Sequence, residues 1–251
     1  AVCTTSGKLF LWGYLDPSSE DNYTYHPVQI DLADRQVVSI SCGNARTAAV
    51  CSDGTLWTNT ENLTLTFEQK LSDVKFKSVS CGSDHMLALA RDGSVWALYS
   101  YQHFPSHIIS LPGKASAISC GYSESAIVCD GKVYINNNFQ DSIVNNFNEI
   151  IFNVITDEIV DISCGTYHTV ALASGRQTIW TWGRNEHNQL GRATIGQRTS
   201  VPAPIKLKDM GICEKVIAGF DKTALLCRPS VSTSDLISRE IGMTRGTKRK
   251  R

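Results

Sequence analysis

Histidine and cysteine are the residues of this chain best suited to acid–base chemistry or metal binding, and both recur at fixed spacing. His85 and His168 each lie three residues after a Cys-Gly pair. A histidine at such a position could act as a catalytic base or a metal ligand. Neither has a repeated acidic or cysteine partner, so no Ser-His-Asp triad and no paired-carboxylate site is indicated. We therefore interpret both as structural residues that hydrogen-bond loop backbone and hold a turn.

The nine cysteines do not form a recognisable metal or disulfide pattern. A zinc site would need Cys-x-x-Cys pairs, and there are none. Cys42 and Cys51, like Cys120 and Cys129, are nine residues apart, but the intervening turn puts the partners at opposite ends of a hairpin. The sequence therefore predicts small, buried, apolar cysteines in a reducing compartment, with no catalytic residue, no metal and no other cofactor.

These residues are carried by an internal repeat. A Ser-Cys-Gly triplet, preceded by an apolar residue, recurs with its cysteine at positions 42, 81, 120 and 164, in steps of 39, 39 and 44 residues. After each triplet come a second apolar run, a glycine turn and an aromatic third run. The best-formed copy, residues 159–192, alternates apolar and polar residues as half-buried strands do. A decayed copy occupies residues 216–227, and a partial copy opens the chain.

A period near 40 residues with strand-sized units predicts an all-β fold, a β-propeller of four-stranded antiparallel blades. Outer strands are expected near residues 26–32, 67–71, 107–111, 149–152 and 205–207. Four units are then complete, the first lacks its innermost strand and the last lacks its outer two. Pairing of the two partial units would give five blades, and upstream sequence would allow six or seven. We expect five or six in this chain.

The repeat is similar to that of the regulator of chromosome condensation family. The resemblance is carried by Cys164-Gly165, His168-Thr169, Trp182-Gly183, Asn185 and the tripeptide 189–191. Family propellers usually have seven blades, and the founding member exchanges guanine nucleotides on a Ran-type small GTPase. The repeat positions interpreted as structural are Gly43, Gly82, His85, Gly121, Gly165, His168 and Gly183. We expect the turn glycines to supply positive φ angles rather than to bind phosphate.

Charge divides the chain into two parts. Residues 228–251 carry seven Lys or Arg against two acidic residues, whereas the whole chain has zero net charge. We predict a propeller domain over residues 1–227 and a basic, largely disordered tail over residues 228–251. The tail ends in a candidate nuclear-import signal, and nucleic acid or chromatin contact is expected only through it: Lys248, Arg249, Lys250 and Arg251. No apolar run reaches the length of about 20 residues that a membrane span needs, so no membrane insertion is expected.

The sequence favours a non-catalytic protein–protein interaction scaffold with a regulatory role, located in the cytoplasm, the nucleus or both. Loops on a rigid propeller commonly carry recognition. The predicted partner-binding residues belong to one polar loop: Arg184, Glu186, His187, Arg192 and Arg198. The alternative, which rests on the family resemblance, is guanine-nucleotide exchange on a Ran-type small GTPase, with association to chromatin. The loops after the repeat glycines show no consistent acidic row, which favours the scaffold.

Overall fold

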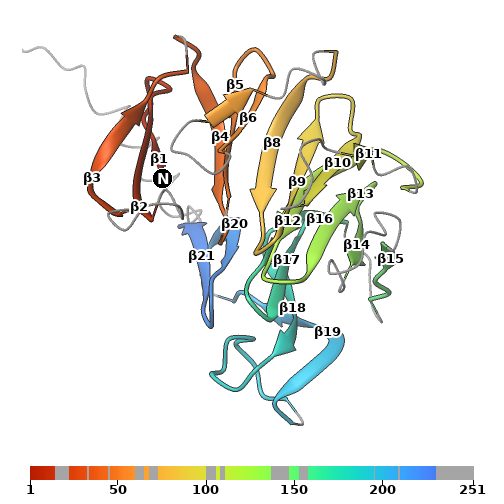
Figure 1. The fold of residues 1–251 in the computed structure, drawn as a ribbon. Coiled ribbons are helices and arrows are strands. Elements are labelled where there is room, and N and C mark those ends of the chain that lie inside the picture. The colour runs from red at the N-terminus through yellow and green to blue at the C-terminus, as the bar shows by residue number, and fades with distance from the viewer. Residues whose placement is uncertain are drawn as a thin grey trace, which may run out of the picture.

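The computed structural model of the protein consists of antiparallel β-sheets connected in chain order (Figure 1). It describes residues 1–14, 23–32, 34–44, 46–59, 65–67, 73–99, 106–107, 111–136, 147–152, 158–194, 196–208 and 210–229. All regular elements in these ranges are strands. These ranges therefore contain no helix long and apolar enough to cross a membrane. The all-β prediction is confirmed.

Four sheets are complete four-stranded blades, in which the strands follow one another from the innermost to the outermost. They are β4 (Val37–Cys42) to β7 (Leu65–Phe67), β8 (Phe76–Cys81) to β11 (Ser106–His107), β12 (Ala115–Cys120) to β15 (Asn148–Glu149), and β16 (Ile159–Cys164) to β19 (Arg198–Lys206). Their middle strands are β5 (Thr47–Cys51), β6 (Leu56–Asn59), β9 (His85–Ala90), β10 (Val95–Tyr99), β13 (Ser125–Cys129), β14 (Lys132–Asn136), β17 (His168–Ala173) and β18 (Thr178–Arg184). Each Ser-Cys-Gly triplet ends an innermost strand, as the repeat predicts. Residues 68–72 and 108–110, within or beside two predicted outer strands, lie outside the described residues.

The first and last sheets are partial blades. The first contains β1 (Val2–Cys3), β2 (Leu9–Tyr14) and β3 (Tyr23–Ile30), and the last contains β20 (Ile212–Ala218) and β21 (Thr223–Arg228). In the described part of the chain no strand pairing joins these two sheets. The described residues therefore form six sheets, the larger of the two predicted blade numbers, and within these residues the partial units do not merge into one blade.

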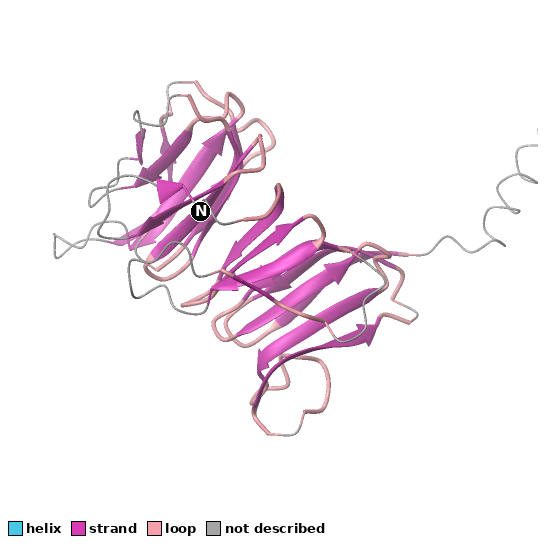
Figure 2. Ribbon diagram, turned by 90° about the vertical axis from the view of Figure 1, so that its right-hand side faces the viewer, coloured by secondary structure: helices cyan, strands magenta, loops and turns pink. Residues whose placement is uncertain are grey.

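The core lies between neighbouring sheets, which pack face to face (Figure 2). The second strand of each complete blade is buried on both faces because a sheet covers it on either side, and every residue of β9, β13 and β17 is buried. Aromatic rings complete the packing: Phe152 meets Trp180 edge to face at 5.1 Å and Trp182 at 6.1 Å. Burial of apolar area of this kind is the main stabilising contribution to a fold.

Hydrogen bonds also connect each blade to the next. The backbone N–H of Cys81 donates to the Ser41 hydroxyl of the preceding blade at 2.9 Å. The same bond recurs, at the same distance, from Cys120 to Ser80, from Cys164 to Ser119 and from Ala218 to Ser163. A small hydroxyl side chain is needed at this position because it accepts a bond across the gap between innermost strands. The serine of the triplet is thus a connector between blades, a role that the sequence did not reveal.

The turn glycines Gly54, Gly93 and Gly131 have positive φ angles, as predicted, whereas the triplet glycines are required for a different reason. Gly183 has a φ of +106°, as expected, but the triplet glycines do not have positive φ angles. A Cβ on Gly82 would instead lie 2.5 Å from the carbonyl oxygen of Gly121 in the next blade. Gly43, Gly121 and Gly165 face the next blade's glycine carbonyl in the same way. Close approach of successive innermost strands around the axis, rather than backbone conformation, excludes side chains here.

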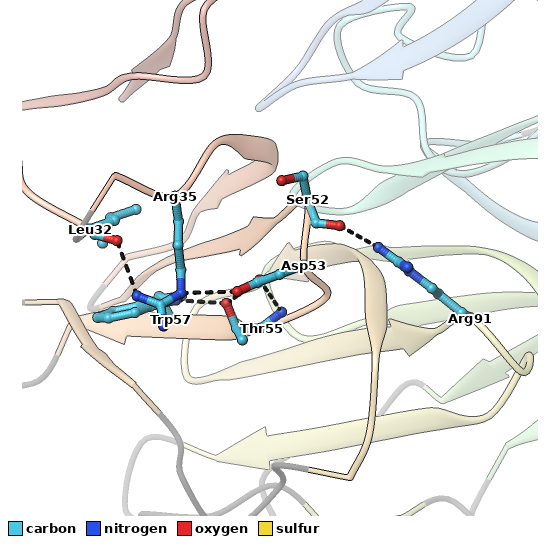
Figure 3. Close-up of polar contacts among 7 residues, drawn as sticks. All are labelled: Leu32, Arg35, Ser52, Asp53, Thr55, Trp57 and Arg91. Carbon is cyan, nitrogen blue, oxygen red and sulfur yellow. Dashed lines mark hydrogen bonds and ion pairs between the residues drawn. The ribbon is translucent and has the colours of Figure 1, made fainter.

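The other ends of the hairpins are held by polar contacts within the protein (Figure 3). The Asp53 carboxylate accepts hydrogen bonds from Thr55 and from the Arg35 guanidinium, which also lies 5.4 Å from the Trp57 ring centroid. Arg91 reaches from the next blade to the carbonyl oxygen of Ser52 at 2.6 Å. These charged and aromatic groups stabilise the turns of the propeller and link neighbouring blades.

Candidate protein-binding surface

The predicted loop lies between β18 and β19, at the end of the propeller where the Ser-Cys-Gly triplets also end. Arg184 is the last residue of β18, and Arg198, an exposed side chain, is the first of β19. The Arg184 guanidinium hydrogen-bonds the Glu186 carboxylate and lies 5.4 Å from the ring centroid of Tyr167. This hydrogen bond lowers the pKa of Glu186. The pair is therefore a positioned ion pair at the surface.

Contacts with the last sheet fix the position of this loop. The His187 imidazole lies 3.7 Å from the Asp221 carboxylate, and the Gln189 amide donates to the same carboxylate at 3.4 Å. The Thr223 hydroxyl donates to the Gln189 carbonyl oxygen at 2.7 Å. Two loops from neighbouring sheets are thereby joined into one surface.

Arg192, although predicted as a partner-binding residue, is directed inward. Its guanidinium donates to the Thr181 hydroxyl at 3.1 Å and to the Thr181 carbonyl oxygen at 2.8 Å, and burial lowers its pKa. Asn185 is buried below the loop, where it accepts a hydrogen bond from the Leu190 N–H and donates to the Arg192 carbonyl oxygen. Arg192 therefore shapes the loop, and its guanidinium is occupied within the protein.

Exposed aromatic side chains lie beside these residues. Tyr122, Tyr167 and Phe220 are 51%, 39% and 72% exposed, although each belongs to the short loop after an innermost strand. The rings of Tyr122 and Tyr167 are 5.9 Å apart. The Thr166 N–H donates to the Gly219 carbonyl oxygen, which places the loop of Phe220 beside the loop of Tyr167. We call Tyr122, Tyr167, Arg184 and Phe220 the aromatic surface.

The sequence analysis missed the three aromatic residues of this surface. A signal was present, because each is an aromatic residue within two positions of a repeat glycine, in loops that are otherwise polar. Tyr122 and Tyr167 are 45 residues apart in the chain, and Tyr167 and Phe220 are 53 apart. Only the folded structure shows that their loops are neighbours.

A depression of about 230 Å³ lies on the axis at the same end. Glycines of five successive sheets contribute to its wall, with Cys81, Cys120 and Cys164. Its lining, taken over the described residues, contains no Asp, Glu, Lys, Arg or His. In the same part of the chain, no three His, Cys, Asp or Glu side chains come together as a metal-binding group. The described lining therefore offers binding area without a charged side chain.

His85 and His168 connect blades. The Nε2 atom of His85 is hydrogen-bonded to the Ser125 hydroxyl of the next blade at 2.6 Å, and that of His168 to the Thr223 hydroxyl at 3.0 Å. Burial lowers the pKa of both histidines, to about 4 for His85. At the equivalent position Glu124 accepts a hydrogen bond from Thr169 of the next blade. These partners are side chains of the neighbouring sheet, and His168 also contacts loop backbone at Lys222, as predicted.

Lys248, Arg249, Lys250 and Arg251, the predicted import signal, lie outside the described residues. The boundary predicted at residue 227 falls at the end of β21, and the described residues end at Pro229. The predicted tail and its role therefore stay predictions.

Several known proteins are similar to this chain. Family models described as "Regulator of chromosome condensation (RCC1) repeat" match residues 76–97 and 159–189, and residues 178–226. The human protein "Probable E3 ubiquitin-protein ligase HERC6" is 31% identical over 124 residues. This match covers 45% of the present chain and only 12% of that relative.

Solved structures share the fold. Human WBSCR16 superimposes with a TM-score of 0.70 at 19% identity, over 86% of this chain and 65% of its own. Prp20p from Saccharomyces cerevisiae, whose structure was described with its binding to Gsp1p and histones, has a TM-score of 0.70 at 15% identity. That match covers 97% of this chain and 69% of Prp20p. Residues 76–97 and 159–226 therefore carry repeats of the regulator of chromosome condensation type, and the chain shares its fold with these solved structures.

Proposed function

We propose that this chain is a non-catalytic protein–protein interaction scaffold that binds its partner through the aromatic surface. The observation that carries the proposal is the row of exposed rings of Tyr122, Tyr167 and Phe220 beside the positioned guanidinium of Arg184. Tyrosine and arginine are the residue types that dominate binding energy at protein interfaces. Aromatic side chains also lose little conformational entropy on binding, since they have few rotatable bonds.

The loops that carry the aromatic surface are held in place before any partner binds. The Arg184 N–H donates to the Tyr167 carbonyl oxygen at 2.8 Å, and the Ser83 N–H donates to that of Tyr122 at 3.3 Å. Such preorganisation reduces the entropic cost of association. The Arg184–Glu186 ion pair and the contact between His187 and Asp221 border the rings and supply a polar rim. Arg198 stays a predicted contributor at the edge of the same loop.

The proposal is tested by affinity capture followed by binding measurements with each captured protein. The test variant combines Tyr122→Ala, Tyr167→Ala and Phe220→Ala, and the control combines Tyr25→Ala and Ile151→Ala, which remove exposed apolar side chains elsewhere. Partners should be retained by the parent chain and the control, and should bind the test variant at least about tenfold more weakly. If the parent chain, the control and the test variant bind equally, and cooperative melts show that each is folded, the aromatic surface is not the binding site.

The alternative function is guanine-nucleotide exchange on a Ran-type small GTPase, with chromatin contact through the basic tail. The similarity to Prp20p favours it. Release of fluorescent GDP from a panel of small GTPases, Ran included, separates the two proposals. Exchange activity requires a saturable acceleration above the spontaneous rate, whereas a scaffold gives none. Deletion of residues 248–251 would test the tail, because loss of nuclear accumulation or of nucleosome binding is expected if it carries either role.

A further inference from the structure

Cys213 and Cys227 face each other in the last sheet. They are directly opposed residues of β20 and β21. The same register position in the other sheets holds Val37 with Cys51, Phe76 with Ala90, Ala115 with Cys129 and Ile159 with Ala173. Among these described pairs, only the last sheet has a cysteine on both strands.

The opposed positions have the geometry of a disulfide. Directly opposed residues in an antiparallel pair project to the same face, with Cα atoms about 4.5–5.5 Å apart. A disulfide requires Cα atoms about 4.4–6.8 Å apart. Both side chains pack in one apolar cluster against the preceding sheet. Both are free thiols in this structure.

We infer that Cys213 and Cys227 form a redox-active pair that closes a reversible cross-strand disulfide. Its oxidant is a low-molecular-weight disulfide of the glutathione class. The inference does not depend on the proposed binding function, because it concerns the base of the β20–β21 hairpin.

Exposure sets the order of the two chemical steps. Cys227 is half-buried, whereas Cys213 is fully buried and its pKa is raised to about 11 by burial and by the neighbouring Cys227 thiol. The Cys227 thiolate therefore attacks one sulfur of the oxidant, a mixed disulfide forms, and the first small thiolate leaves and takes up a proton. The Cys213 thiolate then attacks the Cys227 sulfur and displaces the second small thiol. Two protein thiols are oxidised and one small disulfide is reduced to two thiols.

The pair joins the two strands of a hairpin whose second strand is uncovered on one side in the described residues. In the described residues β21 has no strand on its outer side, and Ile217 and Leu226 are exposed on the face directed away from the preceding sheet. The hairpin between the cysteines has Phe220 and Asp221 at its turn. Local unfolding is favoured where few apolar side chains are buried and backbone hydrogen bonds are exposed to solvent. A covalent bond between the two strands should therefore suppress local unfolding of this hairpin.

The test uses the full chain, reduced and then incubated with oxidised glutathione, and maps its disulfides by mass spectrometry of proteolytic peptides. A peptide pair linking Cys213 to Cys227 is expected, with loss of two hydrogen atoms. Amide hydrogen exchange of β21 should slow at least about tenfold on oxidation and recover when dithiothreitol is added. Cys213→Ala should stop the reaction at a glutathione adduct on Cys227.

Two further results keep the test independent of any one variant. The pair Ala115–Cys129 is the internal control, and Cys129 should acquire no intramolecular link. Val37→Cys places a second thiol opposite Cys51 at the matched position, and because both side chains are buried there, this pair should stay reduced under the same treatment. The inference would be overturned if the folded parent carried glutathione on Cys227 without the link, or if Cys213 bonded a different cysteine.

Discussion

Protonation of the buried His85 should weaken the fold as the pH falls. The imidazole is 4% exposed and hydrogen-bonded to Ser125, and burial lowers its pKa from 6.5 to about 4. In the unfolded chain it titrates near its ordinary pKa, so below that value the unfolded state binds the proton first. The contribution of neutral His85 to the free energy of unfolding is fully present above the pKa of the unfolded state. It is lost as the pH falls from that value toward the pKa of the folded state. At about pH 5 the loss amounts to about 2 kcal/mol, since each pH unit is worth about 1.4 kcal/mol.

The perturbation that isolates this contribution is His85→Gln, which keeps a hydrogen-bond donor but cannot be protonated. Urea unfolding at about pH 7 and about pH 5 gives the free energy of unfolding at each pH for the parent and the variant. The loss between the two pH values should be about 2 kcal/mol smaller in the variant. His26→Gln, which changes an exposed histidine on β3, is the matched control and should behave like the parent.

The result that refutes this reasoning is an equal loss of stability in the parent and in His85→Gln over the same pH interval. It would mean that the folded protein accepts the proton at this site without cost. His85 would then be accessible to solvent, contrary to its burial between the blades.

Two further predictions concern the contacts between blades. Gly82→Ala should lower the free energy of unfolding by about 1–3 kcal/mol, because its Cβ would lie 2.5 Å from the Gly121 carbonyl oxygen. Gly219→Ala, at the equivalent position of the last sheet, meets its nearest atom at 3.7 Å and should be tolerated; equal effects in urea unfolding would contradict the close-approach explanation. Ser119→Ala should cost about 1–3 kcal/mol, because the buried Cys164 N–H loses its acceptor. The exposed Ser200→Ala is its control, and thermal melts in which Ser119→Ala resembles that control would argue against the serine as a connector.

The sequence by itself determined the class of fold and the order of strands in each repeat, whereas every outer strand begins earlier than predicted, at Tyr23, Leu65, Ser106, Asn148 and Arg198. The recurrence of Ser-Cys-Gly, the glycine turns and the alternating apolar residues were sufficient for the class and the order, because strand formation depends on patterns only a few residues long. The partial first and last units were also evident, since the repeat is incomplete at both ends of the pattern. The inward role of Arg192 was not, because a polar residue in a loop has the same local pattern whether it faces solvent or the blade below.

The tertiary structure decided what the repeated residues do. Ser119 accepts a hydrogen bond from Cys164, His85 bonds Ser125, and Gly82 faces Gly121, and each contact joins residues about 40 positions apart in successive blades. The aromatic surface and the Cys213–Cys227 pair have the same origin, since they arise from loops and strands brought together by packing and register. Local sequence patterns fix which strands form, whereas contacts across a blade boundary depend on how the sheets are placed around the axis.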